Sequence, residues 1–288
     1  MRDLVELVMN GVFFLMGMTA IAFVALITVY MFVSGLPAIA KIGPVDFLLG
    51  RTWASTAAQP SYGILPFILT SFFGTLGAVL IGIPVGLLTS VFLSKIASPR
   101  MAALVSSAVE LLAGIPSVIY GLIGMVVLVP AVASVFGLAS GACMLTAILV
   151  LAVMILPSII SVSVTALNAV PKEYEEASLA LGTTKIETYF KVSLPAAKSG
   201  IAAGIVLGVG RAMGEAMAIM MVAGNVANMP GLFKSVRFLT TAIASEMSYA
   251  SGLQRQALFS IALVLFVFIM LLNALLNRIL KGGSEDER

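Results

Sequence analysis

The chain has 288 residues, of which 60% are hydrophobic and only 10% are charged, and its mean hydropathy is +1.13. Because soluble globular domains carry roughly 25% charged residues, this composition excludes that class and predicts an integral membrane protein. The net charge of +3 is spread over short loops, so it does not favour a nucleic-acid partner. The chain has no histidine, and its single Cys143 cannot form an intramolecular disulfide. We therefore predict no catalytic residues and no metal site.

Six apolar segments are near or above the roughly 20 residues that a membrane-spanning helix needs. The first is longer than the apolar region of a signal peptide, roughly 7–15 residues, and is predicted to be a retained helix. The third is interrupted by Gly114-Ile115-Pro116; its first part, Pro99 to Ala113, carries Glu110 and is predicted to be an interfacial or gating helix that leads into a true span. The segments cover about 8–33, 66–93, 101–130, 142–166, 198–224 and 255–280.

The basic residues are unequally divided between the two sides of this six-span arrangement. Apart from Arg211, ten lie on the side of both termini and five on the other, so the positive-inside rule predicts cytoplasmic termini. The opposite side has two loops, 34–65 and 225–254, long enough to hold short helices that meet an external partner. Trp53, in the first of them, is open to reading as an interfacial anchor. The ten are Arg2, Lys95, Arg100, Lys172, Lys185, Lys191, Lys198, Arg278, Lys281 and Arg288; the five are Lys41, Arg51, Lys234, Arg237 and Arg255.

The whole chain, 1–288, is predicted to be one transmembrane domain of an all-α polytopic protein. Residues 1–65 form the first helix and an external loop, residues 66–280 form the core, and the polar tail 281–288 is predicted to be disordered.

The cytoplasmic loop 167–197 is the most heavily charged part of the chain. Together with the adjoining Lys198 it holds four lysines and four glutamates. Pro171 followed by acidic residues predicts a helix start, and Gly182 predicts its end. Thr184-Lys185-Ile186-Glu187 predicts a capping box for a second short helix, ended by Leu194-Pro195. On periodicity alone, a helix–turn–helix against the membrane and a solvated loop remain equal alternatives.

The fifth segment carries an ionisable pair, Arg211 and Glu215. Arg211 falls near the membrane midplane, where a charge is costly and normally faces protein or water. The spacing of four predicts that both side chains share one helix face, while the glycine pairs 204/208 and 210/214 predict close helix packing. Two readings stay open: a self-neutralised pair that fixes packing, or a pathway site where the guanidinium binds an oxyanion and Glu215 positions it.

The spacing of the cytoplasmic loop resembles the E-A-A-x3-G-x9-I-x-L-P loop of ABC importer permeases, with Ser178 for the second Ala and Val192 for Ile. The resemblance implies the MetI-like permease fold, and implies that the first short helix is a coupling helix seated on an ATP-hydrolysing subunit. By this resemblance the ATPase-coupling residues are Glu176, Ala177, Gly182, Leu194 and Pro195.

Two further segments, 110–121 (ELLAGIPSVIYG) and 210–225 (GRAMGEAMAIMMVAGN), look like the permeases of phosphate-specific (Pst) ABC transporters. Residues 47–53 and 62–68 resemble the C-type subunit of that family. The likeness implies a bacterial or archaeal inner-membrane location and phosphate passage along Arg211 and Glu215. It implies as partners an A-type permease, two ATPases and a periplasmic phosphate-binding protein. Possible gating or structural residues are Glu110, for which a structurally bonded interface role is the favoured reading, Gly114, Pro116 and Asn225.

Other classes fit the sequence less well. A membrane enzyme would need a catalytic cluster, and a secondary transporter would need its own ion-coupling site and commonly internal repeats. The runner-up within transport is a permease for another oxyanion, molybdate or sulfate. No G-x4-G-K-[ST] motif occurs, so ATP and Mg²⁺ are expected to be used by the partner ATPase, with no cofactor in this chain. Six spans are few for a fully lined pathway, so we expect a permease dimer.

Overall fold

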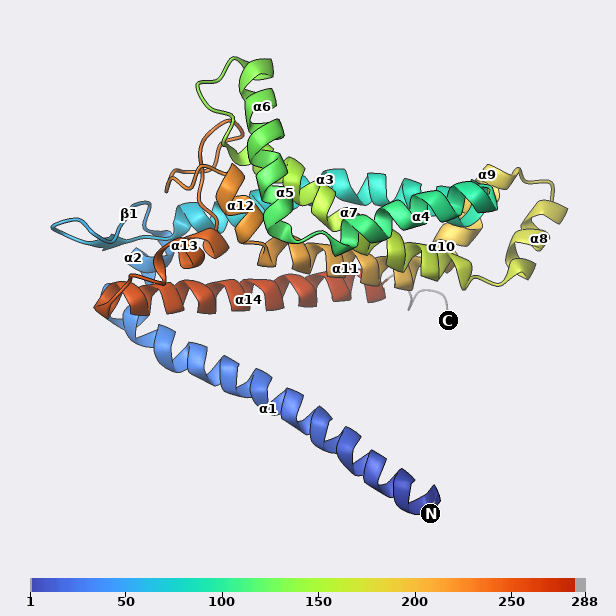
Figure 1. Ribbon diagram of the computed structural model, residues 1–288, viewed down its shortest axis with the longest axis horizontal. Coiled ribbons are helices and arrows are strands. Elements are labelled where there is room, and N and C mark those ends of the chain that lie inside the picture. The colour runs from blue at the N-terminus through green and yellow to red at the C-terminus, as the bar shows by residue number, and fades with distance from the viewer. Residues whose placement is uncertain (1, 283–288) are drawn as a thin grey trace.

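The computed structural model describes residues 2–282, which fold mainly into helices (Figure 1). Three of the elements, η1, η2 and η3, are π-helical turns. In chain order the elements are α1 (Arg2–Ile42), α2 (Pro44–Leu49), β1 (Trp53–Ala54), β2 (Ser61–Tyr62), α3 (Leu65–Val91), η1 (Phe92–Ile96), α4 (Pro99–Gly114), α5 (Ser117–Ile123), η2 (Gly124–Leu128), α6 (Val129–Phe136), α7 (Met144–Asn168), α8 (Lys172–Ala180), α9 (Lys185–Thr188), η3 (Tyr189–Ser193), α10 (Leu194–Ala196), α11 (Lys198–Gly214), α12 (Met217–Val222), α13 (Leu239–Glu246) and α14 (Gly252–Gly282).

The described residues include five helices long and apolar enough to cross a membrane, or six if one bent pair counts as a single span. That pair joins 185–196 to 198–214 with a bend of 73°. The all-α multi-span fold predicted from hydropathy is therefore confirmed. The first helix is longer than its apolar segment and reaches Ile42, and α14 continues to Gly282. The rest of the tail predicted to be disordered, 283–288, lies outside the described residues.

The core of the bundle is the packing of α7 against α3 and α11. Three glycines of α3, Gly77, Gly82 and Gly86, leave the space that isoleucine side chains of α7 fill. A Cβ atom at Gly82, for example, would lie 2.6 Å from Ile155 Cδ1. Small residues of this kind let membrane helices approach closely. Buried apolar side chains along α7 then form the main core cluster.

The glycines of α11 divide into two groups. Cβ atoms at Gly204 and Gly208 would lie 3.2 Å from Val162 Cβ and 3.0 Å from Ile159 Cγ1, so this pair packs closely on α7, as predicted. Around Gly210 and Gly214 no neighbouring atom of the described chain lies within 4 Å of the Cβ position. The second pair therefore leaves open space beside the part of α11 that carries Arg211.

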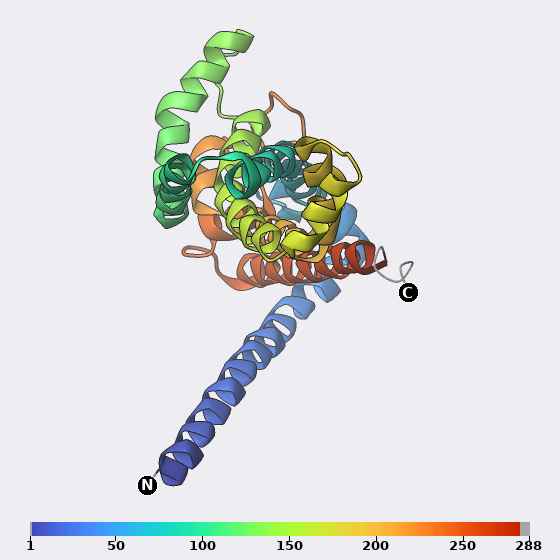
Figure 2. The same ribbon diagram turned by 90° about the vertical axis from the view of Figure 1, so that its right-hand side faces the viewer.

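The third predicted segment is broken at Ile115-Pro116, as the proline requires. Its first half, α4, packs along α7, whereas α5, η2 and α6 run across the direction shared by α3, α7 and α14 (Figures 1 and 2). Gly137, at φ +64°, ends α6 in the left-handed conformation typical of a helix C-terminus.

Helix α1 leaves the bundle and touches it only near its C-terminal end (Figure 1). There Ser260 Oγ donates a hydrogen bond to Gly35 O at 2.5 Å, and Tyr30 meets Phe259 edge to face. Gly35 allows this approach, because a Cβ atom there would lie 3.0 Å from Phe259 O. The most apolar 18-residue window of α1 has no buried residue in this chain.

The two ends of the bundle are different in kind. One end carries α2, the short β1–β2 hairpin and α13, and the other carries α8 and α9 (Figure 1). In the hairpin Trp53 pairs with Tyr62 and Ala54 with Ser61. The predicted loops 34–65 and 225–254 thus hold short helices, as expected, with α1 occupying the start of the first.

Candidate functional site

The helix that carries Arg211 ends before Glu215. Helix α11 stops at Gly214, Glu215 adopts an extended conformation (φ −71°, ψ 130°), and a new helix, α12, begins at Met217. The prediction that Arg211 and Glu215 share one helix face is therefore wrong. Glycine is a weak helix former, so a helix can end at Gly214. The polar groups of Glu215 at this break form hydrogen bonds with other residues, which makes the interruption possible inside the bundle.

The Glu215 carboxylate caps α12 and is not paired with Arg211. Its Oε1 accepts a hydrogen bond from Ala218 N at 2.9 Å, in the first turn of the new helix. Its backbone oxygen accepts from Thr240 Oγ1 at 2.7 Å, so α13 is hydrogen-bonded to the break. A carboxylate at a helix N-terminus is favoured by the exposed N–H groups there. Glu215 thus shapes the break and leaves Arg211 without its predicted counter-ion.

Arg211 is half-buried and has no hydrogen bond or ion pair with any residue of the described chain. It follows Lys198 by thirteen residues, about 20 Å along the helix at 1.5 Å per residue. Its electrostatic neighbour is the buried Tyr120 of α5, whose hydroxyl donates to Leu112 O at 2.6 Å. A guanidinium at this depth, beside the open space at Gly210 and Gly214, is available to an anion.

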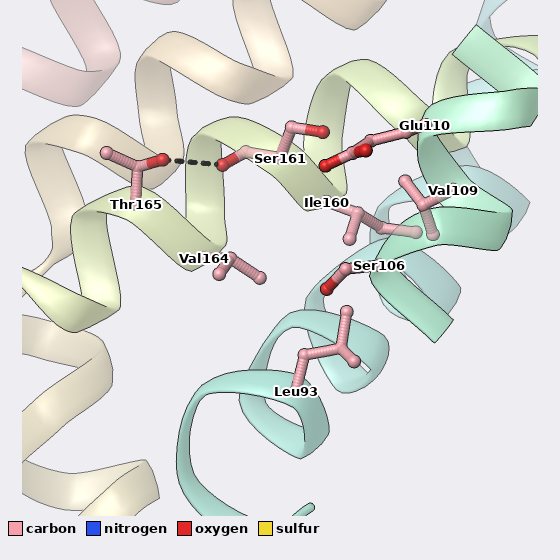
Figure 3. A pocket seen from close by; sticks show the side chains of 8 residues that line it. All are labelled: Leu93, Ser106, Val109, Glu110, Ile160, Ser161, Val164 and Thr165. Atoms are coloured by element: carbon pink, nitrogen blue, oxygen red, sulfur yellow. Dashed lines mark hydrogen bonds between the residues drawn. The ribbon is translucent and has the colours of Figure 1, made fainter. Parts of the chain in front are cut away.

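Glu110 lies on α4 and points into a cavity of about 210 Å³ (Figure 3). Glu110 is exposed and forms no hydrogen bond or ion pair among the residues that the structure describes, so this part of the chain supplies no structural bond to it and its role stays a prediction. Gly114 and Pro116 border a second cavity that Glu110 also lines. The remaining polar side chains of the first cavity are Ser106, Ser161 and Thr165.

Asn225 follows the end of α12, three residues after Val222. It is the single non-glycine residue with positive φ (59°) among residues 2–282, a conformation that asparagine tolerates better than most residues. Its Nδ2 donates to Met220 O at 2.5 Å and so satisfies a carbonyl at the end of the helix. Its own carbonyl accepts from Arg237 Nε at 2.9 Å.

A buried carboxylate, Glu246, organises the end of the bundle that carries the β1–β2 hairpin and α13, and sequence reasoning missed it. Its two oxygens accept from Trp53 Nε1 (3.0 Å), Ser55 Oγ (3.1 Å), Gln254 Nε2 (2.9 Å) and Arg237 Nη1 (2.6 Å). Trp53 is buried against Tyr62 and Phe67, so the reading as an interfacial anchor is wrong. Trp53 and Ser55 lie 193 and 191 residues from Glu246 in the sequence, so spacing gave no signal for the complete cluster.

The loop 167–197 has a helix–turn–helix arrangement, which is one of the two alternatives that its periodicity left open. Helix α8 follows Pro171, Gly182 has φ +86°, and the capping box of Thr184 and Glu187 is present. The second helix is less regular than predicted: α9, the π-helical η3 and α10 follow one another, and Pro195 lies inside α10 with Leu194 at its start.

Ser178, which replaces the second Ala of the motif, is buried under the turn of this loop. Its Oγ lies 2.8 Å from Thr183 Oγ1 and 3.1 Å from Thr188 Oγ1, and Thr183 Oγ1 donates to Ser178 O. Three hydroxyls thus fix the two helices of the loop to each other. The loop is a preformed unit held together by its own polar contacts.

The outer surface of the loop is exposed and contains both apolar and acidic side chains. Glu176 and Ala177 are exposed, and Leu181 has 88% of its surface accessible. Tyr174, Ile186 and Phe190 are exposed beside them. Leucine and isoleucine side chains that are exposed on a charged loop are suited to covering by another protein.

Comparisons with known proteins show which family this chain belongs to. The family described as "Binding-protein-dependent transport system inner membrane component" matches residues 78–282. The chain belongs to this family. It is a multi-pass inner-membrane component of a transport system, a permease. The match contains the loop 167–197, Arg211, Glu215 and Glu246.

Relatives of this permease cover most of the chain. A probable ABC transporter permease protein, YqgH of Bacillus subtilis, is 39% identical to this chain. The aligned region covers 88% of this chain and 84% of YqgH. The phosphate transport system permease protein PstC of Pasteurella multocida is 37% identical over 77% of this chain and 75% of its own. A solved chain of the MetNI methionine ABC transporter superposes with a TM-score of 0.58 at 22% identity, covering 83% of this chain and 98% of that one. That likeness shows the predicted ABC importer permease fold.

Proposed function

We propose that this permease is the C-type subunit of an ATP-driven importer and forms part of the path for inorganic phosphate. The observation that carries the proposal is the state of Arg211: a half-buried guanidinium with no ion pair or hydrogen bond among residues 2–282. An unpaired charge within a membrane is costly, and a passing oxyanion compensates it. The similarity to phosphate transport permeases supports phosphate as that anion.

The chemistry of a guanidinium fits an oxyanion. Its planar set of N–H donors matches two oxygens of a phosphate at once. Because Glu215 is occupied in capping α12, its carboxylate does not neutralise Arg211 through a direct contact. In this proposal Glu215 is a positioning residue that fixes the break after Gly214, and Arg211 is the group that meets the anion.

The proposed partners follow from the two ends of the bundle. At the α8–α9 end, one of two ATPase subunits docks on the exposed face around Glu176, Ala177 and Gly182, and the ATPases use ATP and Mg²⁺; this chain itself takes no cofactor. At the α13 end, a periplasmic phosphate-binding protein delivers the anion. A homologous A-type permease completes the path, since the open space at Gly210 and Gly214 is unfilled by this chain.

Uptake of radiolabelled phosphate into vesicles tests the proposal. The permease is reconstituted with its second permease, its ATPase and its binding protein, and molybdate and sulfate are added as competitors. We expect ATP-dependent phosphate uptake that neither competitor suppresses. Import of another oxyanion in place of phosphate would refute the substrate assignment.

Substitution of Arg211 tests the role of that residue. Arg211→Gln removes the charge and is expected to abolish uptake, at least a hundredfold, because an oxyanion in a low-dielectric path loses its charged hydrogen bonds, each of about 1.5–3 kcal/mol. Arg211→Lys keeps the charge without the planar donor set and is expected to retain a fraction of uptake. Assembly with the other subunits, measured by co-purification, should be unchanged in both. Full uptake by Arg211→Gln would show a purely structural residue.

A further inference from the structure

Three cytoplasmic elements meet at one carboxylate, that of Glu175. Lys95 Nζ lies 2.5 Å from Glu175 Oε1, and the two side chains are only 12% and 19% exposed. Ser193 Oγ donates to the same oxygen at 2.9 Å, and Ser193 is fully buried. Lys95 belongs to η1, Glu175 to α8 and Ser193 to η3. Two of the three π-helical turns among residues 2–282 therefore converge on the helix that we assign to ATPase docking, and such turns are frequent at functional sites.

The contacts of Glu175 lie away from the exposed face of α8. Successive residues of an α-helix point about 100° apart, so Glu176 is exposed while Glu175 is directed to Lys95 and Ser193. A partner that displaces α8 from its exposed face must move the Glu175 carboxylate with it. The groups in direct contact with this carboxylate, which must respond to its movement, are Lys95 of η1 and Ser193 of η3.

Segment η1 leads directly into α4, which carries Glu110. Between Lys95 and the first residue of α4 lie only Ile96, Ala97 and Ser98, and Ser98 Oγ accepts from Met101 N as the cap of α4. Two residues before Lys95, Leu93 is packed in one buried cluster with Val109 of α4 and Ile160 of α7. Figure 3 shows Leu93, Val109, Ile160 and Glu110 around the same cavity.

A second contact holds the other side of η1. Ser94 Oγ donates to Asn168 Oδ1 at 2.6 Å, at the end of α7. Segment η1 is thus fixed to the core helix through Ser94 and to the docking helix through Lys95. Its position depends on where α8 stands relative to α7.

We propose that Lys95, Glu175 and Ser193 form a positioning clamp that carries displacement of α8 through η1 into α4, and so couples the ATPase to the cavity at Glu110. The inference rests on the proposed function and deepens it, since it assigns residues to the transmission step. The competing explanation is an ion pair that only stabilises the loop. The two differ in one measurable quantity, the amount of phosphate imported for each ATP hydrolysed.

The experiment uses the complete reconstituted transporter and measures ATP hydrolysis, phosphate uptake and co-purification of the ATPase. Glu175→Gln should keep ATPase association, because Glu175 is not on the docking face, and should keep hydrolysis within about twofold. Uptake per ATP should fall about fivefold or more, the lower range of measured coupling between sites. Lys95→Glu should have the same effect. The double variant Lys95→Glu/Glu175→Lys, which restores an ion pair in reverse, should recover most of the lost coupling.

Two control variants separate coupling from folding. Lys95→Arg keeps the charge and is expected to keep uptake per ATP near the wild-type value. Glu6→Gln removes an exposed carboxylate of α1, far from the docking helix in sequence, and is expected to have no effect. Unchanged uptake per ATP in Glu175→Gln, loss of ATPase association together with uptake, or failure of the charge reversal to recover coupling would each overturn the clamp. A wild-type complex that binds no ATPase or imports no phosphate would instead refute the proposed function.

Discussion

At the scale of single residues, the structure separates two side chains that the sequence places together. Arg211 and Glu215 are four residues apart, which predicts a shared helix face, yet Gly214 ends the helix between them. Whether a helix ends at a glycine depends on the hydrogen-bond partners available to the residues that follow it. Here the partners of Glu215 are Ala218 N and Thr240 Oγ1. These partners come from another turn and another helix, so local sequence rules could not name them.

A charge exchange tests this separation of Arg211 and Glu215. If the two residues formed an ion pair, Arg211→Glu/Glu215→Arg would restore the pair and recover uptake lost by either single change. Because Glu215 caps α12 and Arg211 stands alone, we expect the exchange to recover nothing: arginine offers no acceptor for Ala218 N, and glutamate repels the anion. The measurement is phosphate uptake in vesicles by the double variant and by both single variants. Higher uptake by the double variant than by either single variant would show direct pairing.

Glu246 provides a second prediction at this scale. Glu246→Ala leaves the Arg237 guanidinium and the Trp53 indole N–H without their acceptor in a buried site, and removal of one partner of a buried pair costs about 3–5 kcal/mol. We expect a lower apparent melting temperature in detergent and faster proteolysis of the β1–β2 hairpin. Exposed Glu173→Gln serves as the control. An unchanged melting temperature for Glu246→Ala would contradict the role of Glu246 as the organising group.

At the scale of elements, the loop 167–197 is the part that sequence predicts best. Its start after Pro171, its turn at Gly182 and the capping box of Thr184 and Glu187 all depend on neighbours within a few residues. The irregular stretch from α9 to α10 was not predicted, because the π-helical η3 is fixed by the contact of Ser193 with Glu175, eighteen residues away in sequence. Local signals thus predict helix ends well and tertiary distortions poorly.

Substitution of Gly182 tests whether the turn of the loop 167–197 needs glycine. Its φ of +86° strains any residue with a Cβ, although no neighbour lies within 4 Å of the Cβ position. Gly182→Ala is therefore expected to cost about 1–2 kcal/mol of local stability through the backbone alone, and to reduce ATPase association. Gly182→Asn should be milder, because asparagine enters this conformation more readily. Equal binding of the ATPase by all three proteins would show that the turn does not need glycine.

The capping box predicts a pH effect on the same loop. Hydrogen bonds from the Thr184 backbone N–H and hydroxyl, followed by the Lys191 charge, lower the pKa of Glu187 below its ordinary 4.5. A lowered pKa means that the carboxylate stabilises the folded loop above pH 4.5 and that this stabilisation is lost as the pH falls through the lowered value. Amide exchange of 184–188, corrected for the intrinsic rate, should show protection that falls only below pH 4.5. Thr184→Ala should lose the protection at every pH.

At the scale of the whole molecule, hydropathy predicts the all-helical multi-span fold but not how the helices are arranged. The apolar runs locate α1, α3, α7 and α14, since burial in lipid or protein demands the same composition. The same runs do not reveal that α1 leaves the bundle or that α5 and α6 cross its direction (Figure 2). Those positions depend on contacts between residues far apart in the sequence, such as Ser260 with Gly35.

The division of the bundle into two unlike ends gives a prediction of orientation. The structure places α8 and α9 at one end and the β1–β2 hairpin with α13 at the other (Figure 1), and the excess of basic residues predicts that the first end is cytoplasmic. Cys143 is the single cysteine and is buried, so Cys143→Ala is a clean background for single engineered cysteines. In whole cells a membrane-impermeant maleimide should label Arg51→Cys and Lys234→Cys, whose side chains are exposed at the outer end. Lys172→Cys and Lys185→Cys, equally exposed at the other end, should react only after the membrane is opened. The reverse pattern would invert the orientation and remove α8 from the reach of a cytoplasmic ATPase.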